Sequence, residues 1–256
     1  MPHRVFSQEF SFGDYLKESF ALLTRNIIPL LVMNIIFIIP TIFNNITNEI
    51  SEFSIAMNPR LFFSTLIVSL ISFIGNIATL KILHNDLFEE KSSYSELFSF
   101  SLKRYFPYLV GMLVYALFIL VGSLLLIIPG FIVAIMLIYT VYIVVLRQYN
   151  NPVDAMQYSR KLVKGRFGRT FGYILSMGIM IIVIYLIFEM ILTIALSGGE
   201  INLANIVSLG QGQSPISIII SNIMLILVSC FSSAFILLMM INYEAEKGYF
   251  VEEGKE

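Results

Sequence analysis

Five long stretches of this chain contain no charged residue, and few folds are open to such a chain. A helix needs roughly 20 apolar residues to cross about 30 Å of hydrocarbon. The third stretch is long enough for two crossings, and the turn dipeptide Pro129-Gly130 is expected to divide it. The fifth begins as a polar loop up to Pro215, which leaves room for one crossing. The stretches are residues 26–48, 61–80, 105–146, 170–188 and 201–243.

The expected fold is all-α, a polytopic integral membrane protein with six transmembrane helices. Composition agrees, because 57% of the residues are apolar and 13% are charged, whereas a soluble domain is about half apolar and about a quarter charged. The net charge of −1 excludes a basic nucleic-acid-binding protein. A lone cysteine, Cys230, excludes an internal disulfide. The six spans are expected near residues 27–46, 61–82, 107–128, 131–148, 170–196 and 216–242.

The lysines and arginines lie almost entirely on one side of this topology. With the N-terminus inside, the inner segments hold 15 of these cations and the outer segments hold only Arg60. Lys and Arg in short loops mark the cytoplasmic face, so we expect a multi-pass protein of the cell membrane with both termini in the cytoplasm. The first apolar run is too long for the core of a signal peptide and is expected to stay in the mature protein.

A helix-start signature recurs before each odd-numbered span, at residues 11–14, 93–96 and 151–154. Ser or Asn followed three residues later by an acid lets two side chains satisfy free amides at a helix start. Such signals recur in any helical protein, but the first and third copies align without a gap at an offset of 140 residues. This favours a threefold parallel repeat, in which each unit is an amphipathic juxtamembrane helix and a pair of spans. The single membrane domain, 1–256, then contains units 8–83, 92–149 and 150–243 and a cytoplasmic tail, 244–256.

The most distinctive stretch is a Pro-Gly pair, an apolar span, and a polar segment with small residues at fixed spacing. The pattern is "PG", a span, then "P-x-x-A-x-x-x-S-x-x-L-x-x-G", and it is met by Pro129, Gly130, Pro152, Ala155, Ser159, Leu162 and Gly165. It resembles a group of bacterial six-span membrane proteins that includes the membrane domain fused to some glycerophosphoryl diester phosphodiesterases and stand-alone relatives of unknown function. The chain has no room for the soluble phosphodiesterase barrel. The resemblance therefore implies a helical membrane domain without that hydrolytic activity.

The same segment has a physical interpretation of its own. Asn151 and Pro152 are typical of a helix start, and Gly165 of a helix end in the left-handed conformation. Ala155 and Ser159 are small residues on one helix face, which permits close approach of a neighbouring helix.

A basic rim follows this helix start and is expected to lie next to the inner leaflet. Each cation there can add about 1 kcal/mol of attraction to anionic lipid, so anionic head groups are expected partners. The alternative is that these cations only fix the topology of the chain. The rim consists of Arg160, Lys161, Lys164, Arg166 and Arg169.

No catalytic residue, cofactor or metal is expected. Of the two histidines, His3 and His84, the second has acids nearby, but one histidine among juxtamembrane charges is more typical of a solvated face than of a metal site. Polar side chains inside spans are functional candidates by default, here as a proton or cation site of a transporter. The alternative is that they bridge helices or, for Glu189 near an outer end, are hydrated. These residues are Asn34, Asn76, Glu189 and Asn222.

The expected function is therefore that of a non-enzymatic integral membrane protein. It is associated with lipid or the cell envelope, or it is a membrane partner of another protein. The alternative is a small transporter, or an export or immunity accessory for membrane-active peptides.

Overall fold

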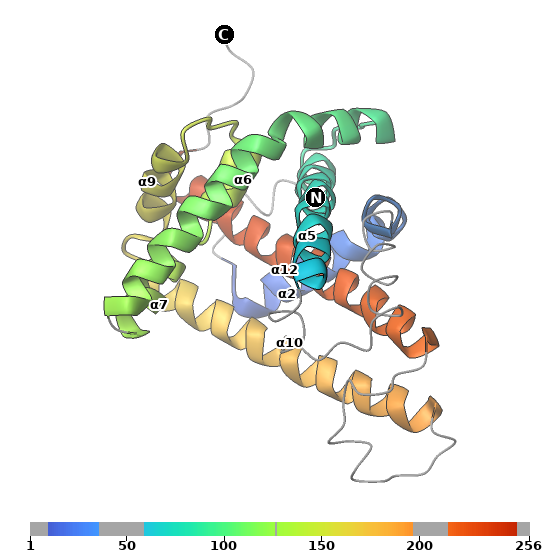
Figure 1. Ribbon diagram of the computed structural model, residues 1–256. Coiled ribbons are helices and arrows are strands. Elements are labelled where there is room, and N and C mark those ends of the chain that lie inside the picture. The colour runs from blue at the N-terminus through green and yellow to red at the C-terminus, as the bar shows by residue number, and fades with distance from the viewer. Residues whose placement is uncertain (1–9, 36–58, 126, 197–214, 250–256) are drawn as a thin grey trace.

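The computed structural model describes residues 10–35, 59–125, 127–196 and 215–249, and every regular element in these ranges is an α-helix (Figure 1). Residues 27–35 are helical as well and follow the turn at Asn26. The helices are α2 (Phe12–Arg25), α5 (Pro59–Leu87), α6 (Tyr94–Leu125), α7 (Ile127–Met136), α8 (Thr140–Leu146), α9 (Pro152–Val163), α10 (Phe167–Leu196) and α12 (Pro215–Glu246).

Five helical segments of the described chain are long and apolar enough to cross a membrane. The described residues confirm the all-α class, and the length and composition of these five helices are compatible with an integral membrane protein. The first expected span, 27–46, is described only as far as residue 35, and its remainder lies outside the described residues. The five segments are Phe62–Leu87, Tyr94–Leu124, Ile128–Leu146, Phe167–Leu196 and Ile216–Glu246.

The second juxtamembrane segment and the third span form one helix, α6, instead of two. Pro107 lies inside this helix without ending it. In the third unit, by contrast, Gly165 separates α9 from α10 with a φ of 86°, a conformation that glycine tolerates best. No glycine interrupts the corresponding part of α6, so the chain continues as a helix.

Pro129-Gly130 does not form the expected turn, because α6 ends at Leu125, α7 begins at Ile127, and the Pro-Gly pair lies in the first turn of α7. A proline is tolerated there because the first N–H groups of a helix have no partner within it. Gly130 serves close packing instead of turning the chain. A Cβ on it would lie 2.9 Å from the backbone of Ser123 and 2.2 Å from its Oγ, so α6 and α7 approach closely at this level.

The fourth expected span is interrupted, because turn residues 137–139 separate α7 from α8. Ser159 of α9 lies at the interruption. Its hydroxyl donates to the Met136 carbonyl at 3.0 Å and accepts from the Tyr139 N–H at 3.2 Å. Buried backbone groups that lack a partner within their own helix need partners of this kind. Neither glycine nor proline stands at 137–139, so the sequence contains no signal for this break.

The expected helix starts are present. Ser11 and Asp14 cap α2 reciprocally, through bonds of 2.9 and 3.3 Å, and Ser93 and Glu96 do the same for α6. The third start differs in detail, because the Asn151 side chain accepts from the N–H two residues later, at 3.0 Å, and not from that of the acid.

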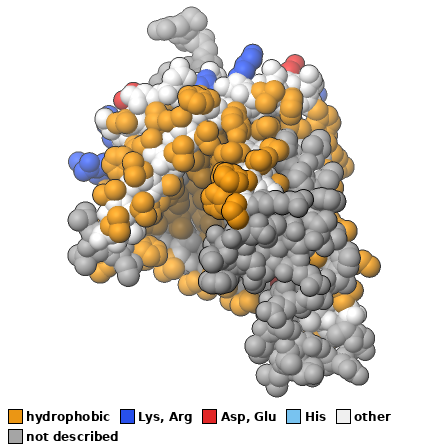
Figure 2. Space-filling view, in the orientation of Figure 1, with side chains coloured by type: hydrophobic (Ala, Val, Ile, Leu, Met, Phe, Trp, Pro, Cys, Tyr) orange, Lys and Arg blue, Asp and Glu red, His pale blue; other side chains and the backbone are white. Residues whose placement is uncertain are grey.

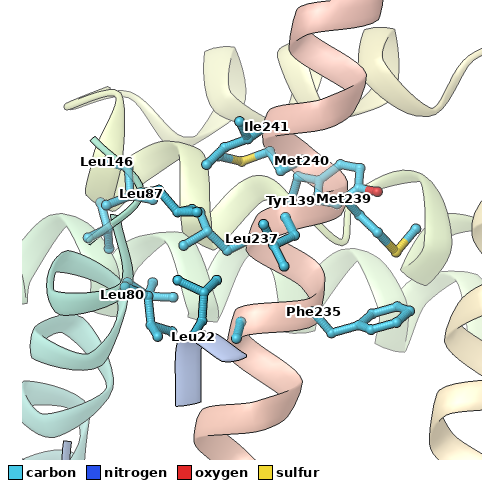
Figure 3. Packing of buried hydrophobic residues seen from close by; sticks show 14 of the residues in the cluster. Leu22, Leu80, Leu87, Tyr139, Leu146, Phe235, Leu237, Met239, Met240 and Ile241 are labelled. Atoms are coloured by element: carbon cyan, nitrogen blue, oxygen red, sulfur yellow. The ribbon is translucent and has the colours of Figure 1, made fainter. Parts of the chain in front are cut away.

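The tightly packed core lies at the end of the molecule that carries the charges. The C-terminal half of α12 runs through it, and eight of the ten side chains from Ala234 to Tyr243 are apolar and completely buried (Figure 3). Residues of α5, α8 and α2 pack around this segment. Elsewhere, large apolar side chains are exposed, and Figure 2 shows them over most of one face, with the charged side chains gathered in its upper part. This distribution suits a lipid-embedded surface below a polar rim.

Candidate functional site

Three arginines at the charged end each contact a polar side chain at the C-terminal end of a later apolar helix. Asp86 and Glu246 lie in the last turns of α5 and α12, and Gln148 lies two residues beyond α8. Each contact therefore holds two segments that are far apart in the sequence at the same level of the molecule. The contacts are Arg25 to Asp86 at 2.7 Å, Arg104 to Gln148 at 2.6 Å, and Arg166 to Glu246.

A buried ion pair fixes the end of α12 against α8. The Glu244 side chain is completely buried, and Arg147 donates to its two oxygens at 2.7 and 3.4 Å. Tyr158 of α9 lies beside the same carboxylate, and its burial together with that negative charge raises the pKa of its hydroxyl. Such a pair constrains position more than it adds stability, because the cost of desolvating two charges offsets most of their attraction.

Lys247, just beyond α12, caps the C-terminus of α9. Its ammonium donates to the backbone carbonyls of Lys161 and Lys164, the second at 3.0 Å. The last carbonyls of a helix lack intrahelical partners and attract cations. Burial and the neighbouring cations Arg166 and Lys164 lower the pKa of Lys247. The end of α12 therefore holds α9 in place.

Tyrosines complete the contacts around the end of α12. Tyr15 of α2 donates to Asn242 Oδ1 at 2.7 Å, and burial raises the pKa of its hydroxyl, as do Tyr243 and Glu246 nearby. The hydroxyls of Thr170 and Tyr243 lie 3.3 Å apart and connect α10 to α12. The described contacts therefore tie α2, α8, α9 and α10 to one helix end.

The basic rim expected from the sequence divides into two groups. The side chains of Arg160, Lys161 and Lys164 are exposed, and no hydrogen bond or ion pair engages them within the described part of the chain. Arg166 and Arg169 are half-buried, and Arg166 pairs with Glu246. Three cations thus face outward, and two belong to the internal contacts of the protein.

The four polar residues expected inside spans make separate contacts in the structure. Asn34 donates to Thr79 Oγ1 at 2.9 Å and to its own helix, so it bridges helices. Asn222 donates to a carbonyl of its own helix, and Asn76 lies beside Tyr108 of α6. No hydrogen bond joins any of the four to another among the described residues.

Glu189 differs from these asparagines. It is buried in α10, contrary to the expectation that it is hydrated, and its Oε1 has no hydrogen-bond partner within the described ranges.

His84 is buried and not part of a solvated face. α5 continues beyond the expected end of the second span, which brings His84 and Asn85 into the core, where the imidazole stacks on Phe88 with ring centroids 4.4 Å apart. The nearby Asp86 is engaged by Arg25. The described residues contain no group of three His, Cys, Asp or Glu side chains placed to hold a metal ion.

An apolar groove of about 670 Å³ lies between α2, α10 and α12. One face of α2 forms its wall near the charged end, with Gly13, Leu16 and Phe20, and Lys17 is the one charged residue among the side chains described there. The other walls are formed by Met180, Ile181 and Ile184 of α10 and by Met224, Leu227, Val228 and Phe231 of α12. The segment that forms α2 was expected to be an amphipathic juxtamembrane helix, and Phe20, on the side of α2 that lines the groove, is 62% exposed.

Sequence reasoning missed Glu244, Glu246 and the groove. Both acids follow the expected end of the sixth span, so the sequence alone does not distinguish them from ordinary juxtamembrane charges. The signal available was the absence of any glycine or proline between Asn242 and Gly248, which predicts that the helix continues through both acids. A scan against protein-family models and searches of curated proteins and of solved structures found no match to this chain.

Proposed function

We propose that this chain is a non-enzymatic, six-span protein of the bacterial cell membrane that binds anionic lipid head groups at its cytoplasmic face. The observation that carries the six spans is the contact between Arg25 and Asp86 at 2.7 Å. Because α5 crosses once before Asp86, the chain between Arg25 and α5 must cross once as well to return to the same side. Six crossings, an even number, leave both termini on the side that holds nearly all the cations, which is the cytoplasmic one.

The proposal includes a threefold repeat. A completely buried serine stands eight residues after each helix start, and each unit contributes one of the three arginines that contact a distant polar side chain. At the offset of 140 residues, the buried positions of α2 coincide with buried positions of α9. The serines are Ser19, Ser101 and Ser159.

The resemblance to the six-span relatives of the phosphodiesterase membrane domain is part of the same proposal. Its motif residues have structural roles that a family would need to keep. Gly130 permits close packing of α6 and α7, Ser159 forms hydrogen bonds with the free backbone groups between α7 and α8, and Gly165 ends α9.

Lipid binding is supported by the three outward-facing cations of the rim. We expect the triple variant Arg160→Gln, Lys161→Gln, Lys164→Gln to fold, because Arg147, Arg166 and Lys247 keep their internal contacts. At about 1 kcal/mol for each cation, the affinity of the purified variant for phosphatidylglycerol or cardiolipin should be roughly a hundredfold lower than that of the wild type, and salt should narrow the difference. Equal lipid retention would contradict lipid binding by the rim and favour a protein partner.

A second candidate is a small transporter or an export accessory for membrane-active peptides. The buried Glu189 with an unpartnered oxygen favours it, since intramembrane acids serve as proton or cation sites. Glu189→Gln should then abolish transport, or protection against such peptides, without lowering expression or thermal stability. Full activity of the variant would exclude coupling through this residue.

A further inference from the structure

The groove between α2, α10 and α12 runs from the charged end into the depth of the membrane helices. Met180 lies 13 residues beyond the start of α10, which is about 20 Å along the helix at 1.5 Å per residue. One leaflet contributes about half of the 30 Å hydrocarbon core. The groove therefore reaches from the level of α2 to about the middle of a bilayer.

We propose that this groove binds one acyl chain of an anionic glycerophospholipid from the inner leaflet, with the lipid phosphate beside Lys17. The inference rests on the proposed function in one respect, that the α2 end of the molecule faces the cytoplasm. The volume of the groove, about 670 Å³, lies within the roughly 300–1,000 Å³ that is typical of sites for small molecules.

Two features select a lipid as the occupant. The side chains of α10 and α12 that line the groove are all apolar, and they lie at a depth where the protein is surrounded by acyl chains, so a polar ligand would find no hydrogen-bond partner there. The cation stands on α2, at the level where lipid phosphates lie. Lys17 makes no hydrogen bond or ion pair with another residue of the described chain, and an anion is its natural partner in that position.

The chain contains no tryptophan, so one introduced tryptophan is a unique reporter. Phe20→Trp places it in the groove, and Phe106→Trp is a matched control, because Phe106 is 71% exposed on α6 and does not line the groove. Each full-length variant is reconstituted in phosphatidylcholine nanodiscs. A small fraction of the lipid is then replaced by acyl-brominated phosphatidylglycerol or by acyl-brominated phosphatidylcholine, both of which quench tryptophan on contact.

We expect the groove tryptophan to be quenched several-fold more by brominated phosphatidylglycerol than by brominated phosphatidylcholine, and the control tryptophan about equally by both. Lys17→Gln should lower the preference about fivefold, the effect of one cation near anionic lipid. Lys103→Gln, which removes an exposed cation of α6 outside the groove, should leave it unchanged. Ile184→Phe narrows the groove and should reduce quenching by both lipids. Ile182→Phe, on the same helix but outside the groove, should not.

Equal quenching of the groove reporter by the two lipids would overturn the proposal. A preference that survives Lys17→Gln but disappears in the triple rim variant would also overturn it, because the rim alone would then concentrate the lipid near α2. In that case the proposed lipid binding by the rim would stand. If the groove preference holds while the rim variant retains normal lipid, the rim proposal fails and the groove remains.

Discussion

Replacing Glu244 by Gln tests whether the buried end of α12 depends on its ion pair. The Glu244 side chain is fully buried, and Arg147, which is 17% exposed, donates to both of its oxygens. Removal of one member of a buried pair costs about 3–5 kcal/mol, because the other charge remains in a low-dielectric site. We expect the lower end, about 3 kcal/mol, since glutamine keeps one acceptor and the guanidinium is partly accessible. The assay is the free energy of unfolding in mild detergent, followed by helical circular dichroism.

The pair between Lys81 and Glu90 is the matched control. Its atoms are 3.1 Å apart, but the Glu90 side chain is 50% exposed, and such pairs are worth about 0–1 kcal/mol. Replacing Arg147 and Glu244 together by methionine should recover most of the loss, because an apolar pair carries no desolvation cost. The reasoning fails if Glu244→Gln costs no more than Glu90→Gln.

Three further perturbations follow from other contacts. Ser159→Ala removes the hydroxyl that pairs with two backbone groups between α7 and α8, and should cost about 2–4 kcal/mol of stability at roughly 1–2 kcal/mol for each group. The control Ser19→Ala loses a hydrogen bond within its own helix and should cost less than about 1 kcal/mol. Equal costs in the same unfolding assay would contradict the role of Ser159. Gly130→Ala places a Cβ against the Ser123 backbone and should destabilise the protein by about 1–3 kcal/mol. In the control Gly172→Ala the new Cβ meets no atom within 4 Å, so this variant should be tolerated. Wild-type stability of Gly130→Ala would contradict the close packing of α6 and α7. Burial raises the pKa of Tyr15 above its ordinary value of about 10, so its contribution to stability is complete below that pH and is lost as the pH rises further. Tyr15→Phe should therefore weaken the loss of stability above pH 10, and an unchanged pH dependence would contradict this.

Local signals predicted the helix starts well. The caps at Ser11, Ser93 and Asn151 and the left-handed Gly165 depend on residues a few positions apart, so the sequence contains all the groups that make them. Apolar length was equally informative, because crossing a bilayer depends on a local count of residues.

Contacts between distant residues could not be predicted in this way. Arg147 and Glu244 are 97 positions apart, and each alone reads as a juxtamembrane charge. The break between α7 and α8 depends on a serine from α9, and its own residues contain no helix breaker. The burial of His84 depends on how far α5 continues. The groove combines three helices, so the periodicity of α2 alone could not separate its buried side from its groove side.

The accessibility of the two ends of α5 tests the proposed topology most directly. Single cysteines are introduced at Pro59, Lys91 or Tyr249, all exposed, in a Cys230→Ala background that removes the buried native thiol. An impermeant thiol reagent applied to intact cells should label Pro59→Cys, and should label Lys91→Cys and Tyr249→Cys only after the membrane is opened. Labelling of Lys91→Cys or Tyr249→Cys in sealed cells would contradict a six-span protein whose charged end faces the cytoplasm.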